Sequence, residues 1–79
     1  MNEEMLKVDG FDDAIIGHAE VWQAEGQIST LIYSGEKMVK ILMDRDGMPM
    51  DEAEEYLYFN VEGAYMGPST PIIMWETHE

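Results

Sequence analysis

The chain has 79 residues, with 17 acidic and four basic side chains, a formal net charge of −13 at pH 7 and no cysteine. This length predicts one small domain, and the lack of cysteine excludes disulfides and thiolate metal sites and favours a reducing, cytoplasmic compartment. The acidity disfavours direct binding to nucleic acid and to anionic membranes, because both would repel it.

The first ten residues show no periodic pattern, so we expect a flexible amino-terminal segment over residues 1–10 and a single domain over residues 11–76. The segment is acidic and has no long apolar run, unlike a secretory signal. No stretch approaches the roughly 18 consecutive apolar residues that a membrane helix requires.

Two strands are expected next. In residues 14–22, AIIGHAEVW, one set of side chains alternates with a second set, as on the two faces of a strand: Ile15, Gly17, Ala19 and Val21 against Ile16, His18, Glu20 and Trp22. Residues 28–33, ISTLIY, are rich in β-branched and aromatic side chains, which favour a strand. The short link contains Gly26 and predicts an antiparallel hairpin. His18 and Glu20 share one face of the first strand. A lone histidine beside a carboxylate favours a structural hydrogen bond over catalysis.

A first helix is expected over residues 36–45. Ser34 occupies an N-cap position, Glu36 lies in the first turn, and Gly47 follows the helix as a stop signal. The helix is amphipathic, and its apolar face is predicted to consist of Met38, Val39, Ile41, Leu42 and Met43.

A second helix is expected to open at Pro49 and to end before Gly67. Residues three and four positions apart in this helix predict a stripe that faces the core. Asn60 lies within this stripe, and its amide is expected to hydrogen-bond to the backbone of the hairpin or of the GPSTP loop. The stripe consists of Ala53, Tyr56, Leu57, Asn60, Val61 and Ala64.

Residues 71–75, PIIMW, predict a third strand, and Pro71 at its start suits an edge position. The predicted fold is therefore α+β in the order β-β-α-α-β, a three-stranded antiparallel sheet with two helices packed on one face.

The side of the second helix opposite its core stripe carries both acidic and aromatic side chains. Either the rings cover the sheet edge or the other helix, or they are exposed for a basic partner or for a second copy of the chain. The candidate partner-binding residues are Asp51, Glu52, Glu54, Glu55, Tyr58, Phe59, Glu62 and Tyr65.

The sequence predicts no enzyme, no cofactor and no metal site. The DRDGMPMDEAEE stretch fails as a calcium loop, because placing Gly47 at the sixth position puts Leu42 first and Ala53 twelfth. No nucleophile–base pattern and no phosphate-cradling glycine loop is present.

The second half of the chain resembles a family of small, mostly uncharacterised proteins encoded by bacteriophages and prophages, with the pattern DGM-x-x-x-EA-x-E-Y-x-x-FN-x-x-GAY-x-G-x-x-TP. The resemblance runs over residues 13–74 and departs at Pro49, where the family pattern has Ser or Thr as the N-cap. It implies a phage product that acts inside a bacterial host cell. The matching positions are Asp46, Gly47, Met48, Glu52, Ala53, Glu55, Tyr56, Phe59, Asn60, Gly63, Ala64, Tyr65, Gly67, Thr70 and Pro71.

The charge is unevenly distributed, and this suggests a function. All four bases lie in the first 45 residues, and residues 46–79 hold eight acids and no Lys or Arg. Such a field attracts basic surfaces, although acidity also simply keeps a small protein soluble. The favoured hypothesis is a binding module that blocks a basic, nucleic-acid-binding host protein, as anti-CRISPR and DNA-mimic inhibitors do. The alternative is a non-catalytic homo-oligomer that serves phage structure or replication.

Overall fold

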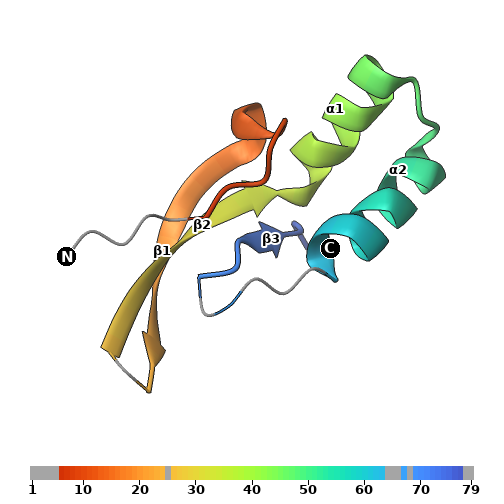
Figure 1. The fold of residues 1–79 in the computed structure, drawn as a ribbon. Helices are drawn as coiled ribbons and strands as arrows, with labels where there is room; N and C mark the ends of the chain where they lie inside the picture. The colour runs from red at the N-terminus through yellow and green to blue at the C-terminus, as the bar shows by residue number, and fades with distance from the viewer. Residues whose placement is uncertain (1–5, 25, 64–66, 68, 78–79) are drawn as a thin grey trace.

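The computed structural model describes residues 6–24, 26–63, 67 and 69–77, and its elements confirm the predicted α+β class and the order β-β-α-α-β (Figure 1). The helices lie together at one side of the sheet, and the far end of the hairpin extends beyond them. The elements are η1 (Asp12–Ala14), β1 (Ile15–Gln23), β2 (Gly26–Ser34), α1 (Gly35–Asp46), α2 (Met50–Leu57), the π-helical turn η2 (Tyr58–Glu62) and β3 (Ile72–Met74).

The described sheet has the order β1-β2-β3, so β2 has a neighbour on each side. β1 and β2 are antiparallel, as predicted, with Gln23 opposite Gly26 and a register shift between Ile15 and Gly17. β3 instead runs parallel to β2, with Ile32 opposite Ile72, so the expectation of a purely antiparallel sheet is wrong.

The parallel direction of β3 follows from the path of the chain before it. α1 leads away from the end of β2, and α2 returns toward the sheet (Figure 1). The Thr30 hydroxyl, buried in the middle of β2, then donates to the carbonyl oxygens of Ser69 at 3.1 Å and Thr70 at 2.8 Å. The chain thus enters β3 level with Thr30 and continues in the direction of β2.

The predicted signals at the ends of α1 are confirmed. The Ser34 hydroxyl accepts a hydrogen bond from the Lys37 N–H at 3.2 Å, and Gly47 adopts the left-handed conformation with φ of 72°. Pro49 precedes α2 without any side-chain cap, and the Asp51 carboxylate accepts from the Glu52 N–H at 2.9 Å. Acids in this first turn are also favoured by the helix dipole.

The core lies between the sheet and the helices, with Tyr33 of β2 fully buried in it. The Tyr33 hydroxyl accepts a hydrogen bond from the Val8 N–H at 2.8 Å, and Arg45 donates to the Gly10 carbonyl at 2.9 Å. These bonds attach residues 8–10, which the sequence assigned to a flexible segment, to the domain. The buried apolar side chains are Phe11, Ala14, Leu31, Tyr33, Met38, Val39, Leu42, Ala53 and Leu57.

The apolar face of α1 is narrower than predicted. Met38, Val39 and Leu42 are buried and Ile41 packs partly against the core, whereas Met43 is 36% exposed. Met43 lies at the margin of the buried stripe, beside a groove between α1 and α2.

The core stripe predicted for the second helix is wrong in part. Ala53 and Leu57 are buried, but Tyr56 and Asn60 are exposed, and the Asn60 amide donates to the Tyr56 carbonyl at 3.1 Å instead of meeting the hairpin or a loop. After Leu57 the helix widens into η2, in which the Gly63 N–H donates to the Tyr58 carbonyl five residues earlier. Each residue of η2 turns through less than 100°, so Asn60 no longer lies where regular helical spacing places it. Tyr56 precedes η2 and is exposed because the buried stripe of α2 is narrower than predicted.

The end of this helix also differs from the prediction. η2 ends at Glu62, with Gly63 as its C-cap, and Gly67 lies beyond it with φ of 100°. Val61 packs partly against the core, and Ala64 lies outside the described residues. Within the described residues, no helix is long and apolar enough to cross a membrane.

Gly35 at the start of α1 allows close contact with Trp75. A Cβ placed on Gly35 would lie 2.5 Å from the Trp75 ring, a distance that requires the ring to move. Beside this contact, the Glu76 N–H donates to the Glu36 carboxylate at 3.1 Å. The segment after β3 is therefore anchored on the first turn of α1.

Replacing Gly35 by Ala is expected to displace Trp75 and to lower the free energy of unfolding by about 1–3 kcal/mol, because overpacking outweighs the better helix propensity of Ala. Urea denaturation measures the stability, and fluorescence in a Trp22→Phe background reports Trp75 alone. Gly17→Ala is the matched control, since a Cβ there meets no atom within 4 Å. Equal stability of the two variants and an unshifted Trp75 emission would contradict the contact.

Candidate functional site

The acids of α2 face the solvent. Asp51, Glu52, Glu54 and Glu55 are all exposed. They follow one another over little more than one helical turn, so their charges add to a strong local field.

Two of the three candidate rings are exposed. Tyr58 is 63% exposed and Phe59 is 67% exposed, and their centroids lie 5.2 Å apart in an edge-to-face arrangement. Neither ring is buried against the sheet or α1, so the interpretation that they complete the core does not hold for these two. Tyr65 and the side chain of Glu62 lie outside the described residues.

A hollow of about 320 Å³ lies beside the Phe59 ring. We call it the acidic–aromatic hollow. It is lined by Met48, Glu52, Glu55, Tyr56, Phe59 and Asn60.

The hollow brings together only part of the predicted set. Glu52, Glu55 and Phe59 line it, whereas Glu54 lines the separate groove of about 230 Å³ between the helices, with Met43, Met50 and Trp75 among its neighbours. The sequence missed Tyr56 and Asn60 as lining residues because both were assigned to the core. Met48 lies in the link between the two helices, directly after Gly47, so helical spacing did not predict it as a lining residue.

The hollow has the chemistry of a receptor for a cationic side chain. Glu52 and Glu55 are three residues apart and therefore neighbours on the helix surface. Carboxylates form charge-assisted hydrogen bonds with Lys and Arg, and aromatic faces attract the same cations. The apolar Met48 offers a surface for the methylene stem of such a side chain.

A larger hollow of about 690 Å³ lies between η1 and α1, and we call it the charge-balanced hollow. It contains three of the four bases of the chain, but three acids accompany them, so its net charge is about zero. It is therefore a poorer candidate than the acidic–aromatic hollow for a charged partner. It is lined by Gly10, Asp12, Asp13, Lys37, Lys40, Ile41, Asp44 and Arg45.

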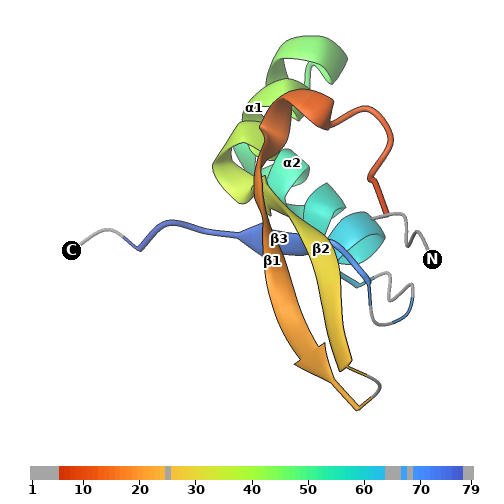
Figure 2. The ribbon, with the colours of Figure 1, turned by 90° about the vertical axis from the view of Figure 1, so that its left-hand side faces the viewer.

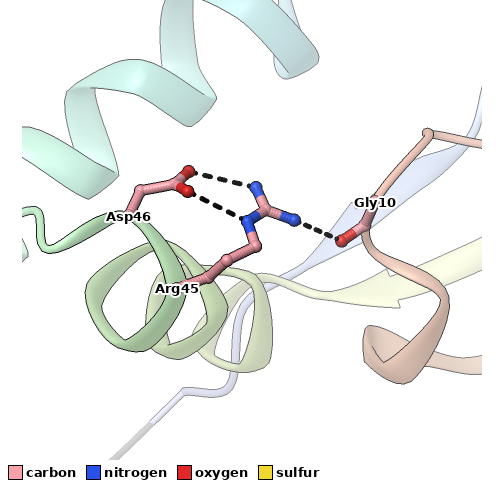
Figure 3. Close-up of polar contacts among 3 residues, drawn as sticks. All are labelled: Gly10, Arg45 and Asp46. Carbon is pink, nitrogen blue, oxygen red and sulfur yellow. Dashed lines mark hydrogen bonds and ion pairs between the residues drawn. The ribbon is translucent and has the colours of Figure 1, made fainter.

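Two of the three cations of the charge-balanced hollow, Lys40 and Arg45, make side-chain contacts within the chain. Lys40 pairs with Asp44 at 3.0 Å. Figure 3 shows Arg45, which makes two contacts of 3.1 Å with Asp46 and one of 2.9 Å with the Gly10 carbonyl. The hydrogen bonds from Arg45 lower the pKa of the Asp46 carboxyl and raise that of the guanidinium. Arg45 thus links α1 to the segment before η1.

His18 lies beside a carboxylate on β1, as predicted. Its Nε2 is 3.2 Å from Glu20, which also accepts hydrogen bonds from the Ser29 hydroxyl at 2.9 and 3.0 Å. Across the described ranges, no group of three or more His, Cys, Asp or Glu side chains is placed to hold a metal ion.

Comparison of the chain with protein-family models, with curated proteins and with solved structures finds no match.

The exposure of Phe59 predicts a contrast with its neighbour Leu57. Phe59→Ala is expected to change the free energy of unfolding by less than about 0.5 kcal/mol, whereas Leu57→Ala, which empties a fully buried site, is expected to cost about 2–5 kcal/mol. Chemical denaturation measures both. A large loss of stability in Phe59→Ala would show that the ring completes the core.

The contact between Arg45 and Asp46 predicts a pKa change. In Arg45→Gln the Asp46 pKa is expected to rise toward its ordinary value of 3.8, as measured by carboxyl NMR titration. Because the folded pKa is depressed, the contact stabilises the protein above the unfolded pKa, and this contribution is lost as the pH falls through the folded value. Lys40→Gln is the control, and it should leave the Asp46 titration in place. An Asp46 titration that Arg45→Gln does not move would contradict the assignment.

Proposed function

We propose that this chain is a protein-binding module that docks its acidic–aromatic hollow and the adjoining Tyr58 ring on a basic surface of another protein. The observation that carries the proposal is the exposed pair of rings, Tyr58 and Phe59, next to the carboxylates of α2. Core packing does not explain aromatic rings that are more than half exposed, and exposed apolar surface of this kind is typical of a binding site. Aromatic residues are typical of the centres of protein interfaces.

The charge supports a basic partner over a second copy at this surface. Residues 46–79 contain no Lys or Arg, so two copies meeting through α2 would place carboxylates against carboxylates. Like charges brought together in this way cost several kcal/mol. A partner with Lys and Arg side chains would instead pair with Glu52 and Glu55.

Basic protein surfaces often serve to bind nucleic acid, because phosphate contacts dominate that affinity. The chain would therefore cover the site where a host protein holds DNA or RNA, and it would act as an inhibitor by occlusion. The resemblance to phage-encoded proteins supports a bacterial host and an anti-defence role, with the module acting in the host cytoplasm. This function requires no cofactor and no covalent reaction.

The proposal is tested by affinity capture from bacterial lysate with the wild type and with a Glu52→Lys/Glu55→Lys variant. The wild type is expected to retain a protein whose binding weakens as salt rises, because salt screens surface charge. The variant is expected to bind it at least about tenfold more weakly, because reversal puts like charges together. Asp9→Lys/Asp13→Lys is the control, since it changes the net charge equally at exposed positions away from α2.

A second measurement tests the occlusion itself. Titrating the chain into a complex of the captured protein and its nucleic acid is expected to release the nucleic acid, as read from a mobility-shift gel. The proposal fails if no salt-sensitive protein is captured, if the reversed variant binds as well as the wild type, or if the nucleic acid stays bound.

A further inference from the structure

β1 forms an outer edge of the sheet. Among the described strands it pairs with β2 alone, and the view of Figure 2 faces this edge. The outer edge of a strand presents a row of backbone N–H and C=O groups that another strand can join. Proteins usually protect such edges with charged side chains, yet β1 carries a single acid, Glu20, in a chain with 17 acids.

The sequence of β1 is self-complementary about Ala19. His18 precedes Ala19 and Glu20 follows it, so two antiparallel copies with Ala19 opposite Ala19 would place each His18 opposite Glu20 of the other copy. Along an edge strand, the backbone N–H and C=O groups of every second residue point outward, and antiparallel pairing sets these residues opposite one another. The two nearest alternative registers that keep this alternation are centred on His18 and on Glu20. They would place His18 opposite His18 or Glu20 opposite Glu20. Only the register centred on Ala19 places each imidazole opposite a carboxylate that can accept its hydrogen bond.

The side chains around Ala19 are already positioned for this exchange. His18 lies 3.2 Å from Glu20 within the chain, and both side chains are about half exposed, at 56% and 47%. The Ser29 hydroxyl holds the Glu20 carboxylate from the side of β2. Each carboxylate can therefore accept from a second imidazole without losing the Ser29 hydrogen bond, because its two oxygens offer several acceptor sites.

The same register brings exposed apolar side chains together. It brings Trp22, which is 75% exposed, next to the irregular position of Ile16 in the second copy, a side chain that is 43% exposed in the single chain. Aromatic and β-branched side chains opposite one another stabilise antiparallel pairs. Both ends of the joint strand pair would then shield apolar surface that is in contact with water in the single chain.

We propose that the chain forms a symmetric dimer in which β1 pairs antiparallel with β1 of a second copy, with Ala19 opposite Ala19. The two sheets become one continuous sheet in the order β3-β2-β1-β1-β2-β3. The dimer leaves α2 and the acidic–aromatic hollow free, so it does not depend on the proposed function.

Charge changes at positions 18 and 20 test the register. His18→Glu places two carboxylates opposite each other at both ends of the central pair, and Glu20→Lys removes the carboxylates that the imidazoles would contact and puts ammonium groups in their place. Each single variant is expected to sediment as a monomer of 9.0 kDa, where the wild type sediments at twice that mass in the micromolar range. An equimolar mixture of the two variants is expected to recover the dimer, because the carboxylate introduced by His18→Glu in one chain then meets the ammonium group introduced by Glu20→Lys in the other.

Gln27→Glu is the matched control, since it adds the same charge as His18→Glu on the neighbouring strand, opposite Trp22, and should leave the dimer intact. Circular dichroism checks that every variant is folded. A monomeric wild type, or variants that dimerise alone as well as when mixed, would overturn the proposal. Salt separates this dimer from the complex with a basic partner. Salt screens the repulsion between two chains of charge −13 and strengthens the dimer, whereas it weakens the complex.

Discussion

The burial of Tyr33 in the central strand is the constraint on which the rest of the fold depends. Its ring fills the core between β2 and the helices, and its hydroxyl fixes the backbone at Val8. A chain of this size buries only about 60% of its unfolded surface, so the space around one large ring is soon filled. On α2 the core admits Ala53 and Leu57, and the Tyr58 and Phe59 rings that follow remain outside it. The exposed rings are thus a consequence of a small core built around a large residue.

The few bases of the chain are used differently from its many acids. Arg45 holds the segment before η1 through the Gly10 carbonyl and lies over the Phe11 ring, with its guanidinium carbon 5.4 Å from the centroid. Lys40 pairs with Asp44 one turn along α1. Arg45 and Lys40 therefore form their contacts within the chain, on α1 and the segment before η1. The carboxylates of α2 are left without basic neighbours along the chain and generate the field that extends into solvent.

Features set by local chemistry were predictable from the sequence, and features set by distant contacts were not. The hairpin, the Ser34 cap and the Gly47 stop depend on neighbouring residues, and the structure has each of them. The direction of β3 depends on the return of the chain to the middle of β2, where the Thr30 hydroxyl donates to carbonyls 39 and 40 residues away, and no local pattern encodes it. For the candidate site, helical spacing correctly separated Phe59 from Leu57. It misplaced Tyr56 and Asn60, because it assumed a regular helix and a wider buried stripe.

The parallel pairing of β3 has a consequence for the order in which the protein assembles. β1 and β2 are joined by a tight turn and can pair within microseconds, and helices form faster still. Ile32 and Ile72 meet across 40 residues, so closing that loop costs chain entropy before any contact rewards it. The short β3 is thus the last strand to join. Until it does, both edges of the hairpin are open, and the Trp75 ring has yet to reach Gly35.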